Sequence, residues 1–406
     1  MKITDVKTVL MTGPTTNDPY IRESRATRSA AYVEIYTDTE LVGLGETYGG
    51  YFFPEGVPPI VEFFKPILVG QNVDNIAELW NRMYHAGNFW CRVGLGAIVL
   101  TGIEAALWDL KGKMYDLPVY ELLGGKKHES LPAYASGGPS NYPLDKLAAK
   151  VDFYLSLGFN GFKVGAGSVT VTPEGTVGYT PMRPAETADF EGGKAAFLRN
   201  HVGPDINIMF DGHMGNSDHT WDLGIAQAVM KAVEPYDLFF FEEPLHYTDP
   251  WSYAELCRTT NVPIAGGECL TAAYEWRVFA EANAFDIGQP DAAFTGGLLE
   301  FMRVAAFMEA RGRSIATHSW GSGGGFMQNL HAGFATPNTV MLEISQNYAG
   351  MHSEMIRDNF QMQDGRVLPP GGPGLGIVLT DEPKNRYPFR PGTGEFNSVP
   401  GKQLIV

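Results

Sequence analysis

Between residues 131 and 345, short apolar runs alternate with longer amphipathic stretches, and this alternation constrains the fold more than any other feature. Near-continuous apolar strands separated by helices are typical of a parallel sheet that is covered on both faces. Eight such strands are enough to close an α/β barrel. We therefore predict a barrel over residues 126–355, with strands at LPAYAS, GFKVG, INIMFD, LFFFEE, PIAGGE, FDIGQPD, SIATH and VMLEIS.

Residues 1–125 have a different pattern, which predicts a separate α+β domain. Three alternating stretches, KITDVKTVLM, SAAYVEIYTDTE and LVGLGETY, predict antiparallel strands, and SAAYVEIYT places every second side chain on one face. Helical patterns follow at 57–69, 73–85 and 95–115, and the last has one apolar stripe. The Pro- and Gly-rich residues 356–406 are expected to pack back onto this domain and complete it.

Composition narrows the classes of function. The formal net charge is −16, so the sequence indicates no basic surface for nucleic acid. The cysteines, Cys91, Cys257 and Cys269, are widely spaced and form no CxxC pair, which argues against a disulfide framework or a thiolate zinc site. No apolar run reaches the roughly 18 residues of a membrane span, and the N-terminus has no apolar leader-like core. We expect a cytoplasmic protein that binds neither nucleic acid nor membrane.

Most of the predicted barrel strands end in a polar side chain. From Asp211 onward, successive positions lie 23 to 31 residues apart, which is one strand, one helix and two short loops. The carboxyl ends of barrel strands meet at one rim, where the catalytic groups of such barrels lie. These side chains are therefore expected to face one cavity; they are Lys163, Asp211, Glu242, Glu268, Asp291, His318 and Glu343.

Three carboxylates, Asp211, Glu242 and Glu268, follow three consecutive strands. Crowded carboxylates repel each other unless a cation lies between them. Mg²⁺ prefers hard oxygen ligands and leaves positions open for water and substrate, and Mn²⁺ is the alternative. Zinc is disfavoured because the sequence has no HExxH motif and no thiolate pair. Because side chains alternate along a strand, Glu243 is expected on the opposite face from Glu242, in a structural role. Any one of the three carboxylates, taken alone, would be interpreted as a helix cap or a loop contact.

His318 follows the strand after the one that ends in Asp291. A carboxylate at this distance orients an imidazole and raises its pKa, so His318 is predicted to act as base or acid. Lys163 and Glu343 flank the acidic group and are expected to contact substrate. A divalent ion and Lys163 would stabilise the enediolate that forms when a proton leaves the carbon next to a carboxylate. The predicted chemistry is abstraction of this proton, followed by re-protonation or loss of a β-substituent.

The ordered motifs resemble those of the enolase superfamily and, within it, the mandelate racemase subgroup, over essentially the whole chain. They are ALWDLKGK, LPVYELLGG, GFKVG, MFDGH, FEEP, GGE, QPD, THSW, LEIS and PGLG. The resemblance implies a modified TIM barrel, (β/α)₇β, beneath an N-terminal α+β capping domain. It implies Mg²⁺ on the three carboxylates, His318–Asp291 as the acid/base dyad, and Glu343 as hydrogen-bond donor or partner to the substrate carboxylate. It also implies a homo-oligomer, from dimer to octamer.

In this family the loops of the capping domain select the substrate, which points to residues 13–28 and 48–53. Arg22, Arg25 and Tyr48 are therefore candidate substrate contacts. The two arginines are alternatively solvated loop charges.

The chain departs from the racemases at the second barrel strand. The racemases have Lys-x-Lys there, with the second lysine as a base on the opposite substrate face, and this sequence has Gly165 at that position. Racemisation needs a base on each face and is therefore in doubt. Asp211 is followed, two residues later, by His213, which resembles the galactonate and mannonate dehydratases, where this histidine acts as acid or base.

The connection 167–190 is long for a barrel loop and is predicted to form a lid. The mannonate dehydratases place a tyrosine base in a comparable segment, so Tyr179 and Arg183 are candidates here. The alternative is that these two residues, like His213, are ordinary loop residues.

These features favour a Mg²⁺-dependent dehydratase of a small anionic sugar acid, an aldonate or aldarate. His318, or His213 and Tyr179 on the other side, removes the α-proton; loss of the 3-hydroxyl then gives a 2-keto-3-deoxy acid. A sugar-acid cycloisomerase is the second hypothesis and a racemase or epimerase the third. A metal-binding barrel without turnover, and a Schiff-base lyase that uses Lys163, complete the alternatives.

Overall fold

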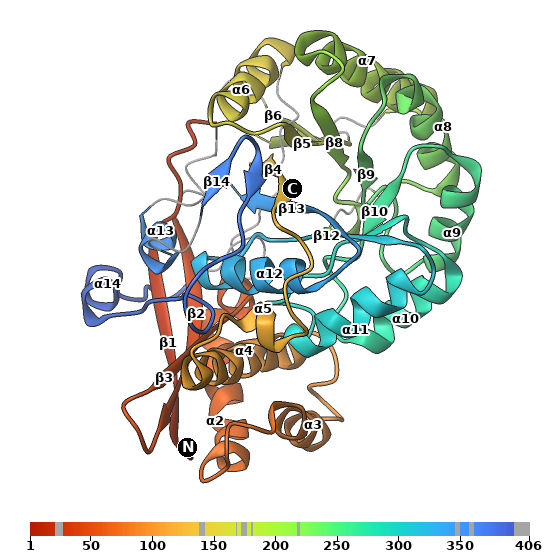
Figure 1. Ribbon diagram of the computed structural model, residues 1–406. Helices are drawn as coiled ribbons and strands as arrows, with labels where there is room; N and C mark the ends of the chain where they lie inside the picture. The colour runs from red at the N-terminus through yellow and green to blue at the C-terminus, as the bar shows by residue number, and fades with distance from the viewer. Residues whose placement is uncertain are drawn as a thin grey trace.

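The computed structural model shows the predicted barrel joined to an N-terminal antiparallel sheet (Figure 1). It describes residues 1–20, 27–137, 143–167, 169–171, 177–179, 182–216, 220–345, 350–356 and 361–393. Eight parallel strands form the barrel, and pairing of the last with the first, from Leu342↔Ala133 to Ser345↔Ser136, closes it. These strands are β4 (Leu131–Ser136), β5 (Gly161–Gly165), β8 (Asn207–Asp211), β9 (Phe240–Glu242), β10 (Ile264–Gly266), β11 (Ile287–Gly288), β12 (Ser314–Thr317) and β13 (Thr339–Ser345).

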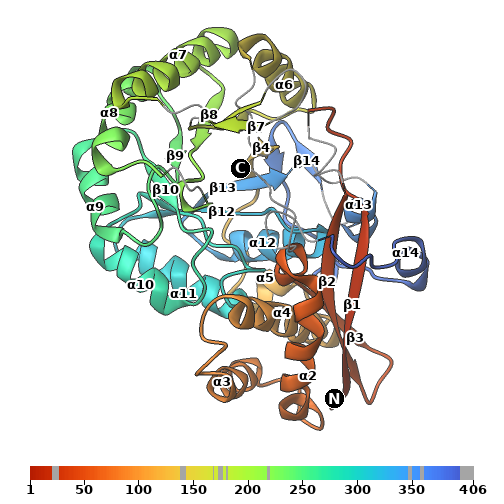
Figure 2. The same ribbon diagram turned by 180° about the vertical axis from the view of Figure 1, so that it is seen from behind.

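Helices form an outer ring around these strands, as Figures 1 and 2 show from opposite sides. They are α6 (Leu144–Ser156), α7 (Pro184–Val202), α8 (Leu223–Val233), α9 (Pro250–Thr259), α10 (Ala273–Ala282), α11 (Leu298–Glu309) and α12 (Gly323–Ala335). A separate cluster of buried side chains fills the inside of the barrel: Tyr134, Met209, Phe240, Ala265, Ile287, Ala316 and Met341. The barrel is therefore a packed core and leaves only its rim for chemistry. None of the helices in the described ranges has the length and apolar character to cross a membrane.

The N-terminal domain is a three-stranded antiparallel sheet covered by helices. The strands are β1 (Ile3–Pro14), β2 (Thr27–Thr37) and β3 (Val42–Thr47); the helices are α1 (Gly49–Phe52), α2 (Val57–Leu68), α3 (Ile76–Ala86), α4 (Leu95–Tyr115) and α5 (Val119–Leu122). β3 approaches α4 so closely that Cβ atoms on Gly43 and Gly45 would lie 2.2 and 2.3 Å from helix carbonyl oxygens. Any larger side chain at these two positions would push the helix off the sheet.

Two patterns expected for amphipathic elements differ in the structure. α4 is buried on nearly every side, from Gly96 to Leu110, although the sequence predicts one apolar stripe. β2 is likewise buried on both faces. The reason is that α4 lies between the sheet and the barrel, where its Glu104 accepts hydrogen bonds from the backbone N–H groups of Leu298 and Leu299 at 2.8 and 3.0 Å, at the start of α11.

The described part of the C-terminal segment contacts both domains. β14 (Met362–Gln363) and β15 (Arg366–Val367) form a hairpin, and β15 pairs with β4 of the barrel. Further on, α14 (Asp381–Arg386) leads to Tyr387, whose carbonyl accepts a hydrogen bond of 3.2 Å from the N–H of Thr12 in β1. The remaining elements are α13 (Met351–Ile356), the hairpin β6 (Val169–Val171) and β7 (Val177–Tyr179), and 3₁₀ turns at Pro54–Gly56, Met214–Asn216 and Glu234–Tyr236.

Glu46 of β3 fastens the N-terminal domain to the start of α12, just after His318. Its buried carboxylate accepts hydrogen bonds from Ser322 N, Ser322 Oγ and Gly325 N at 2.8, 2.6 and 2.7 Å. Glu46→Ala leaves these donors without their acceptor, and we expect the free energy of unfolding to fall by about 2–4 kcal/mol. Chemical denaturation measures this change, with the exposed Glu40→Ala as the control, expected within about 0.5 kcal/mol of the wild type. Equal denaturation midpoints for both variants would contradict the expectation.

Candidate active site

The polar residues predicted from the strand ends lie at one rim of the barrel. Lys163, Asp211, Glu242 and Glu343 are in strands β5, β8, β9 and β13. Glu268, Asp291 and His318 follow β10, β11 and β12 within three residues. Two contact groups result, one around Lys163 and one around His318, and together they contain all seven side chains.

Lys163 is the centre of the first group. Its Nζ lies 2.7 Å from Glu242 Oε2, 3.0 Å from Asp211 Oδ2 and 3.2 Å from Glu343 Oε1. Burial alone would lower the pKa of Lys163, but these three carboxylates raise it well above its usual value. The ammonium therefore stays charged and offsets part of the negative charge at the rim.

The carboxylates outnumber the cations around them. Burial, and then the charge of Asp211, raise the pKa of Glu242 to about 7. Burial also raises the pKa of Glu268 to about 8, against the opposing effect of His318. Glu242 Oε1 is buried and, within the described ranges, has no hydrogen-bond partner. A rim with this excess of hard oxygen donors has the chemistry of a site for a hard divalent cation.

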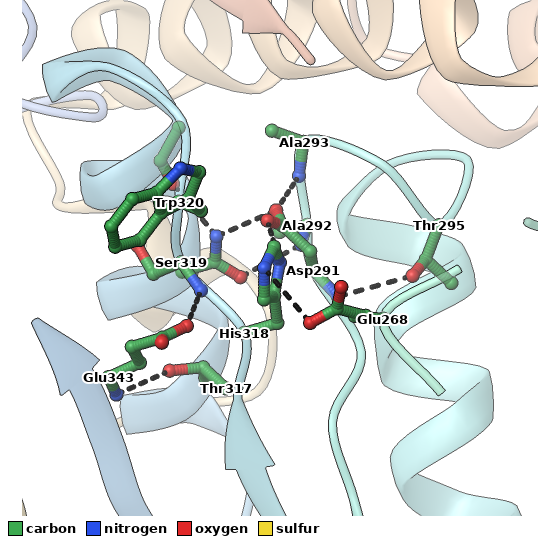
Figure 3. A network of polar contacts seen from close by, with 12 residues as sticks. Glu268, Asp291, Ala292, Ala293, Thr295, Thr317, His318, Ser319, Trp320 and Glu343 are labelled. Carbon is green, nitrogen blue, oxygen red and sulfur yellow. Dashed lines mark hydrogen bonds and ion pairs between the residues drawn. The ribbon is translucent and has the colours of Figure 1, made fainter. Parts of the chain in front are cut away.

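His318 and Asp291 form the predicted pair, shown in Figure 3. His318 Nδ1 lies 2.9 Å from Asp291 Oδ2, and His318 Nε2 lies 3.4 Å from Glu268 Oε2. Burial opposes protonation of the ring, but Glu268 and Asp291 raise the pKa of His318 to about 10. Because Asp291 accepts from Nδ1, the proton that the ring exchanges with a ligand is the one on Nε2.

Asp291 is itself held from behind. Its Oδ1 accepts hydrogen bonds from Ala293 N at 2.7 Å and from Asn329 Nδ2 at 2.8 Å, and its N–H donates to Thr295 Oγ1 at 3.3 Å. Asn329 Oδ1 also accepts from Ala292 N at 2.8 Å. These contacts fix the carboxylate that orients His318.

Glu343 is ionised in this arrangement. Although burial raises the pKa of Glu343, the charges of Lys163 and His318 outweigh it and lower the pKa to about 2. Its Oε2 accepts a hydrogen bond of 2.7 Å from the backbone N–H of Ser319, as Figure 3 shows. A role as hydrogen-bond donor to a substrate would first require a proton on this carboxylate.

Two further candidates lie beside these groups. His213 follows β8 in a left-handed conformation with a φ of 47°, and its Nδ1 is 3.1 Å from Asp211 Oδ1. Tyr48, from the N-terminal domain, is buried, and its ring centroid lies 5.8 Å from that of His318. Tyr48 therefore belongs to the surroundings of the dyad.

The remaining candidates are Arg22, Arg25, Tyr179 and Arg183. Arg22 and Arg25 lie outside the described residues, as does the side chain of Tyr179, whose backbone belongs to β7. Arg183 binds Glu186 in the first turn of α7, with Nε 2.9 Å from Glu186 Oε1, and is largely exposed. β5 ends in Gly165, whose carbonyl accepts a hydrogen bond of 2.7 Å from Lys194 Nζ.

Sequence reasoning missed Gln289, Asn329 and the position of the Glu243 carboxylate. Gln289 donates from Nε2 to Glu242 Oε2 at 2.7 Å, and its place two residues before Asp291 was a usable signal. Asn329 lies inside α12, where nothing in the sequence marks it. Glu243 has a φ of 41°, so the strand alternation used to place it ends there.

In the described part of the chain, one group of three potential ligand atoms from His, Cys, Asp or Glu lies within a mutual distance of 4.8 Å, and it consists of Glu243, Glu268 and Cys269. The three predicted metal ligands are spread more widely than this. Lys163 Nζ explains the spread because it contacts Asp211 and Glu242, whereas Glu268 faces His318.

The chain matches known protein families over most of its length. Residues 6–124 match the mandelate racemase / muconate lactonizing enzyme N-terminal domain, and residues 146–383 match the enolase C-terminal domain-like family. The chain is 29% identical to an arabinonate dehydratase of Saccharolobus solfataricus, over 86% of this chain and 87% of the relative. It is 30% identical to a D-galactonate dehydratase of Ralstonia nicotianae, over 86% and 88%.

The same fold is found in solved structures. The crystal structure of the 3,6-anhydro-D-galactonate cycloisomerase from Zobellia galactanivorans superimposes with a TM-score of 0.80 at 26% identity, over 95% of this chain and 99% of that one. The first family match covers nearly all of the capping sheet, and the second covers the barrel strands from β5 to β13. The chain belongs to the mandelate racemase / muconate lactonizing enzyme family of the enolase superfamily.

Proposed function

We propose that this protein is a Mg²⁺-dependent dehydratase that converts a sugar acid, an aldonate or aldarate, to a 2-keto-3-deoxy acid. The observation that carries the proposal is the His318–Asp291 pair next to the lysine–carboxylate group, with Gly165 at the end of β5 where a second base would lie. A single strong base suits a reaction that removes one proton from one face. The relatives named arabinonate and D-galactonate dehydratase support the choice of reaction.

The residues present fit a hard divalent ion. Asp211, Glu242 and Glu268 would hold it, since their oxygens are the donors that Mg²⁺ prefers and Glu242 Oε1 is buried without a hydrogen-bond partner among the described residues. Bound there, Mg²⁺ or Mn²⁺ would supply positive charge to the substrate carboxylate. Lys163 contacts Asp211 and Glu242, two of the predicted metal ligands, as well as Glu343. It would therefore add a second positive charge near the substrate carboxylate.

We assign the proton transfer to His318. In the neutral form of the ring, Nε2 takes the proton from the carbon next to the substrate carboxylate, and Asp291 stabilises the resulting imidazolium through Nδ1–H. The electron pair left on that carbon forms the C2–C3 double bond as the 3-hydroxyl departs. The departing hydroxide takes a proton from the imidazolium or from His213 and leaves as water. The enol then tautomerises to the 2-keto acid.

Other residues enter the proposal as substrate contacts. Tyr48 lies beside the His318 ring and would face the substrate carbon chain. Arg22, Arg25 and Tyr179 keep their proposed roles, as contacts to substrate hydroxyl or carboxylate groups and as an alternative base. Glu343 would position Lys163, which it contacts at 3.2 Å.

We further propose that the capping domain spans 1–125, the barrel 126–355 and the C-terminal segment 356–406, which agrees with barrel strands from Leu131 to Ser345. A cytoplasmic location is supported by three cysteines without a disulfide. A homo-oligomer, from dimer to octamer, is proposed on the family resemblance alone.

A cycloisomerase is the second candidate, favoured by the structural likeness to the 3,6-anhydro-D-galactonate cycloisomerase. It would use the same His318–Asp291 pair to move a proton without net loss of water. The two reactions differ in their products, so one experiment separates them.

That experiment incubates the protein with Mg²⁺ and a panel of aldonic, aldaric and anhydro-aldonic acids in D₂O. Semicarbazide absorbance reports 2-keto acids, and NMR reports deuterium at C2 of the recovered acid. Keto-acid formation from one or a few open-chain acids is the expected result. Ring opening or deuterium exchange without dehydration would favour a cycloisomerase or epimerase, and no signal across the panel would overturn the proposal.

Asn329 provides a prediction about the support behind the dyad. Asn329→Leu removes the hydrogen bond to Asp291 Oδ1, and we expect kcat to fall about 10- to 100-fold with KM little changed, because Asn329 is buried behind Asp291. Steady-state kinetics measures this. Asn338→Leu is the matched control, because Asn338 Nδ2 donates to Ala305 O and Arg313 O away from the rim. An equal loss of kcat in both variants would make Asn329 merely structural.

A further inference from the structure

Two of the predicted metal ligands are each followed directly by another residue that can bind a metal ion. They are Glu242, which ends β9, and Glu268, which follows β10. Glu243 follows Glu242 and Cys269 follows Glu268. Ligand atoms of Glu243, Glu268 and Cys269 lie within 4.8 Å of one another. None of the roles in the proposed reaction uses Glu243 or Cys269, so this group requires its own explanation.

Within the described ranges, the Glu243 carboxylate is buried and forms no ion pair. The side chain is buried, with a relative exposure of 1%. Oε1 is 3.6 Å from Cys269 Sγ, a weak hydrogen bond from a thiol, and Oε2 is buried without a hydrogen-bond partner among the residues that the structure describes. Leaving such an oxygen unsatisfied is costly, and a cation among the three side chains would remove that cost.

The other two side chains give an ion a way in. Glu268 and Cys269 are only partly buried, and Glu268 borders the space in front of His318. A small ion that enters the active site would therefore reach Cys269 Sγ without unfolding the rim. Glu243 would then be the buried end of the site.

We propose that Glu243, Glu268 and Cys269 form a second cation site, selective for a thiophilic divalent ion such as Zn²⁺. Three protein ligands with one position left for water is a common zinc arrangement, and zinc accepts sulfur together with carboxylate oxygen. Cys269 releases its thiol proton to solvent as the Zn–S bond forms. Mg²⁺ disfavours sulfur, so the thiol separates this site from the all-oxygen group formed by Asp211, Glu242 and Glu268.

Glu268 belongs to both groups, which links the sites. An ion held by Cys269 and Glu243 draws on the Glu268 carboxylate, which lies 3.4 Å from His318 Nε2. Zn²⁺ therefore competes with the Mg²⁺ ligand set and obstructs the base, and it inhibits turnover. This inhibition rests on the proposed function, whereas ion binding at the site does not.

The test of binding uses the full-length, metal-free protein titrated with Co²⁺ as a spectroscopic probe. Cobalt bound to a thiolate gives a sulfur-to-metal charge-transfer absorption in the near ultraviolet, whereas cobalt on carboxylates alone does not. The band is expected in the wild type and absent from Cys269→Ser. Cys257→Ser is the matched control and keeps the band, because Cys257 Sγ bonds Ala284 O at 3.3 Å instead.

Glu243→Gln tests the buried ligand. Losing this carboxylate is expected to weaken Co²⁺ binding at the thiolate by at least about 10-fold, or about 1.4 kcal/mol. No band in the wild type, a band that persists in Cys269→Ser, or unchanged affinity in Glu243→Gln would each overturn the site. A Glu243 carboxyl that only holds the Cys269 thiol in place predicts the first of these outcomes.

The inhibition is measured separately, on the acid that the panel identifies. Zn²⁺ is titrated at fixed Mg²⁺, and each variant is compared with its own rate without zinc. The concentration that halves the rate should rise at least 10-fold in Cys269→Ser. Equal inhibition of wild type and Cys269→Ser would overturn the link. If no acid turns over, the proposed function fails while the cobalt spectra still decide the site.

Discussion

His318→Asn is expected to lower kcat of the proposed dehydration by about 10²- to 10⁴-fold, the contribution that a positioned acid or base makes. Asparagine keeps a polar side chain of similar reach, but it neither accepts nor returns a proton. The buried Asp291 would remain hydrogen bonded to Ala293 N and Asn329 Nδ2, so the fold should persist. Semicarbazide absorbance measures the rate, and the thermal midpoint confirms folding.

His201→Asn is the matched control for this experiment. His201 Nε2 also lies 2.7 Å from an aspartate oxygen, Asp152 Oδ1, but this pair is on the surface of helices α6 and α7. We expect its rate within about twofold of the wild type, because exposed ion pairs contribute little. Deuterium exchange at C2 should also disappear in His318→Asn. Exchange that continues at the wild-type rate would transfer the role of base to His213 or Tyr179.

The barrel could be predicted because its signals are local and repeated. Each apolar run became a strand, and the polar residue at its end came to the rim with the others. The contact between His318 and Asp291 followed from one spacing, since adjacent parallel strands place the two side chains 2.9 Å apart. The expected antiparallel sheet was found for the same reason, that alternation is read directly from the chain.

What could not be predicted depends on contacts between distant segments. α4 has helical periodicity, but only its position between the sheet and the barrel explains why nearly all of it is buried. Asn329 supports Asp291 from 38 residues further along the chain. Glu243 was placed by alternation, yet its positive φ ends the strand and brings its carboxylate near Cys269. Such effects arise from tertiary packing and carry no local pattern.

Removal of divalent ions is expected to abolish turnover and to lower the thermal midpoint by several degrees. Binding to the folded state alone stabilises it by about 2.7 kcal/mol when Mg²⁺ is present at 100 times its dissociation constant. Calorimetry with EDTA and then with excess Mg²⁺ measures the shift. Asp211→Asn should lose most of the increase in thermal midpoint that Mg²⁺ causes. Asp205→Asn, in the exposed turn before β8, should show the same increase as the wild type. A wild-type midpoint that does not respond to Mg²⁺ would contradict the ligand assignment.

The buried carboxylates could be compensated by Lys163 alone or by a bound divalent ion as well. Replacing Lys163 distinguishes these two explanations. If Lys163 alone balances Asp211 and Glu242, Lys163→Met leaves uncompensated buried charges and costs about 3–5 kcal/mol that Mg²⁺ does not restore. If an ion occupies the site, Mg²⁺ restores most of the stability that Lys163→Met loses. Turnover stays low, because the positive charge of Lys163 no longer acts on the substrate carboxylate. Lys194→Met is the control, since its buried partner is Glu191, at 2.7 Å, and not one of the predicted metal ligands. Its loss of stability should be the same with and without Mg²⁺, and we expect Lys163→Met to show the metal-dependent result.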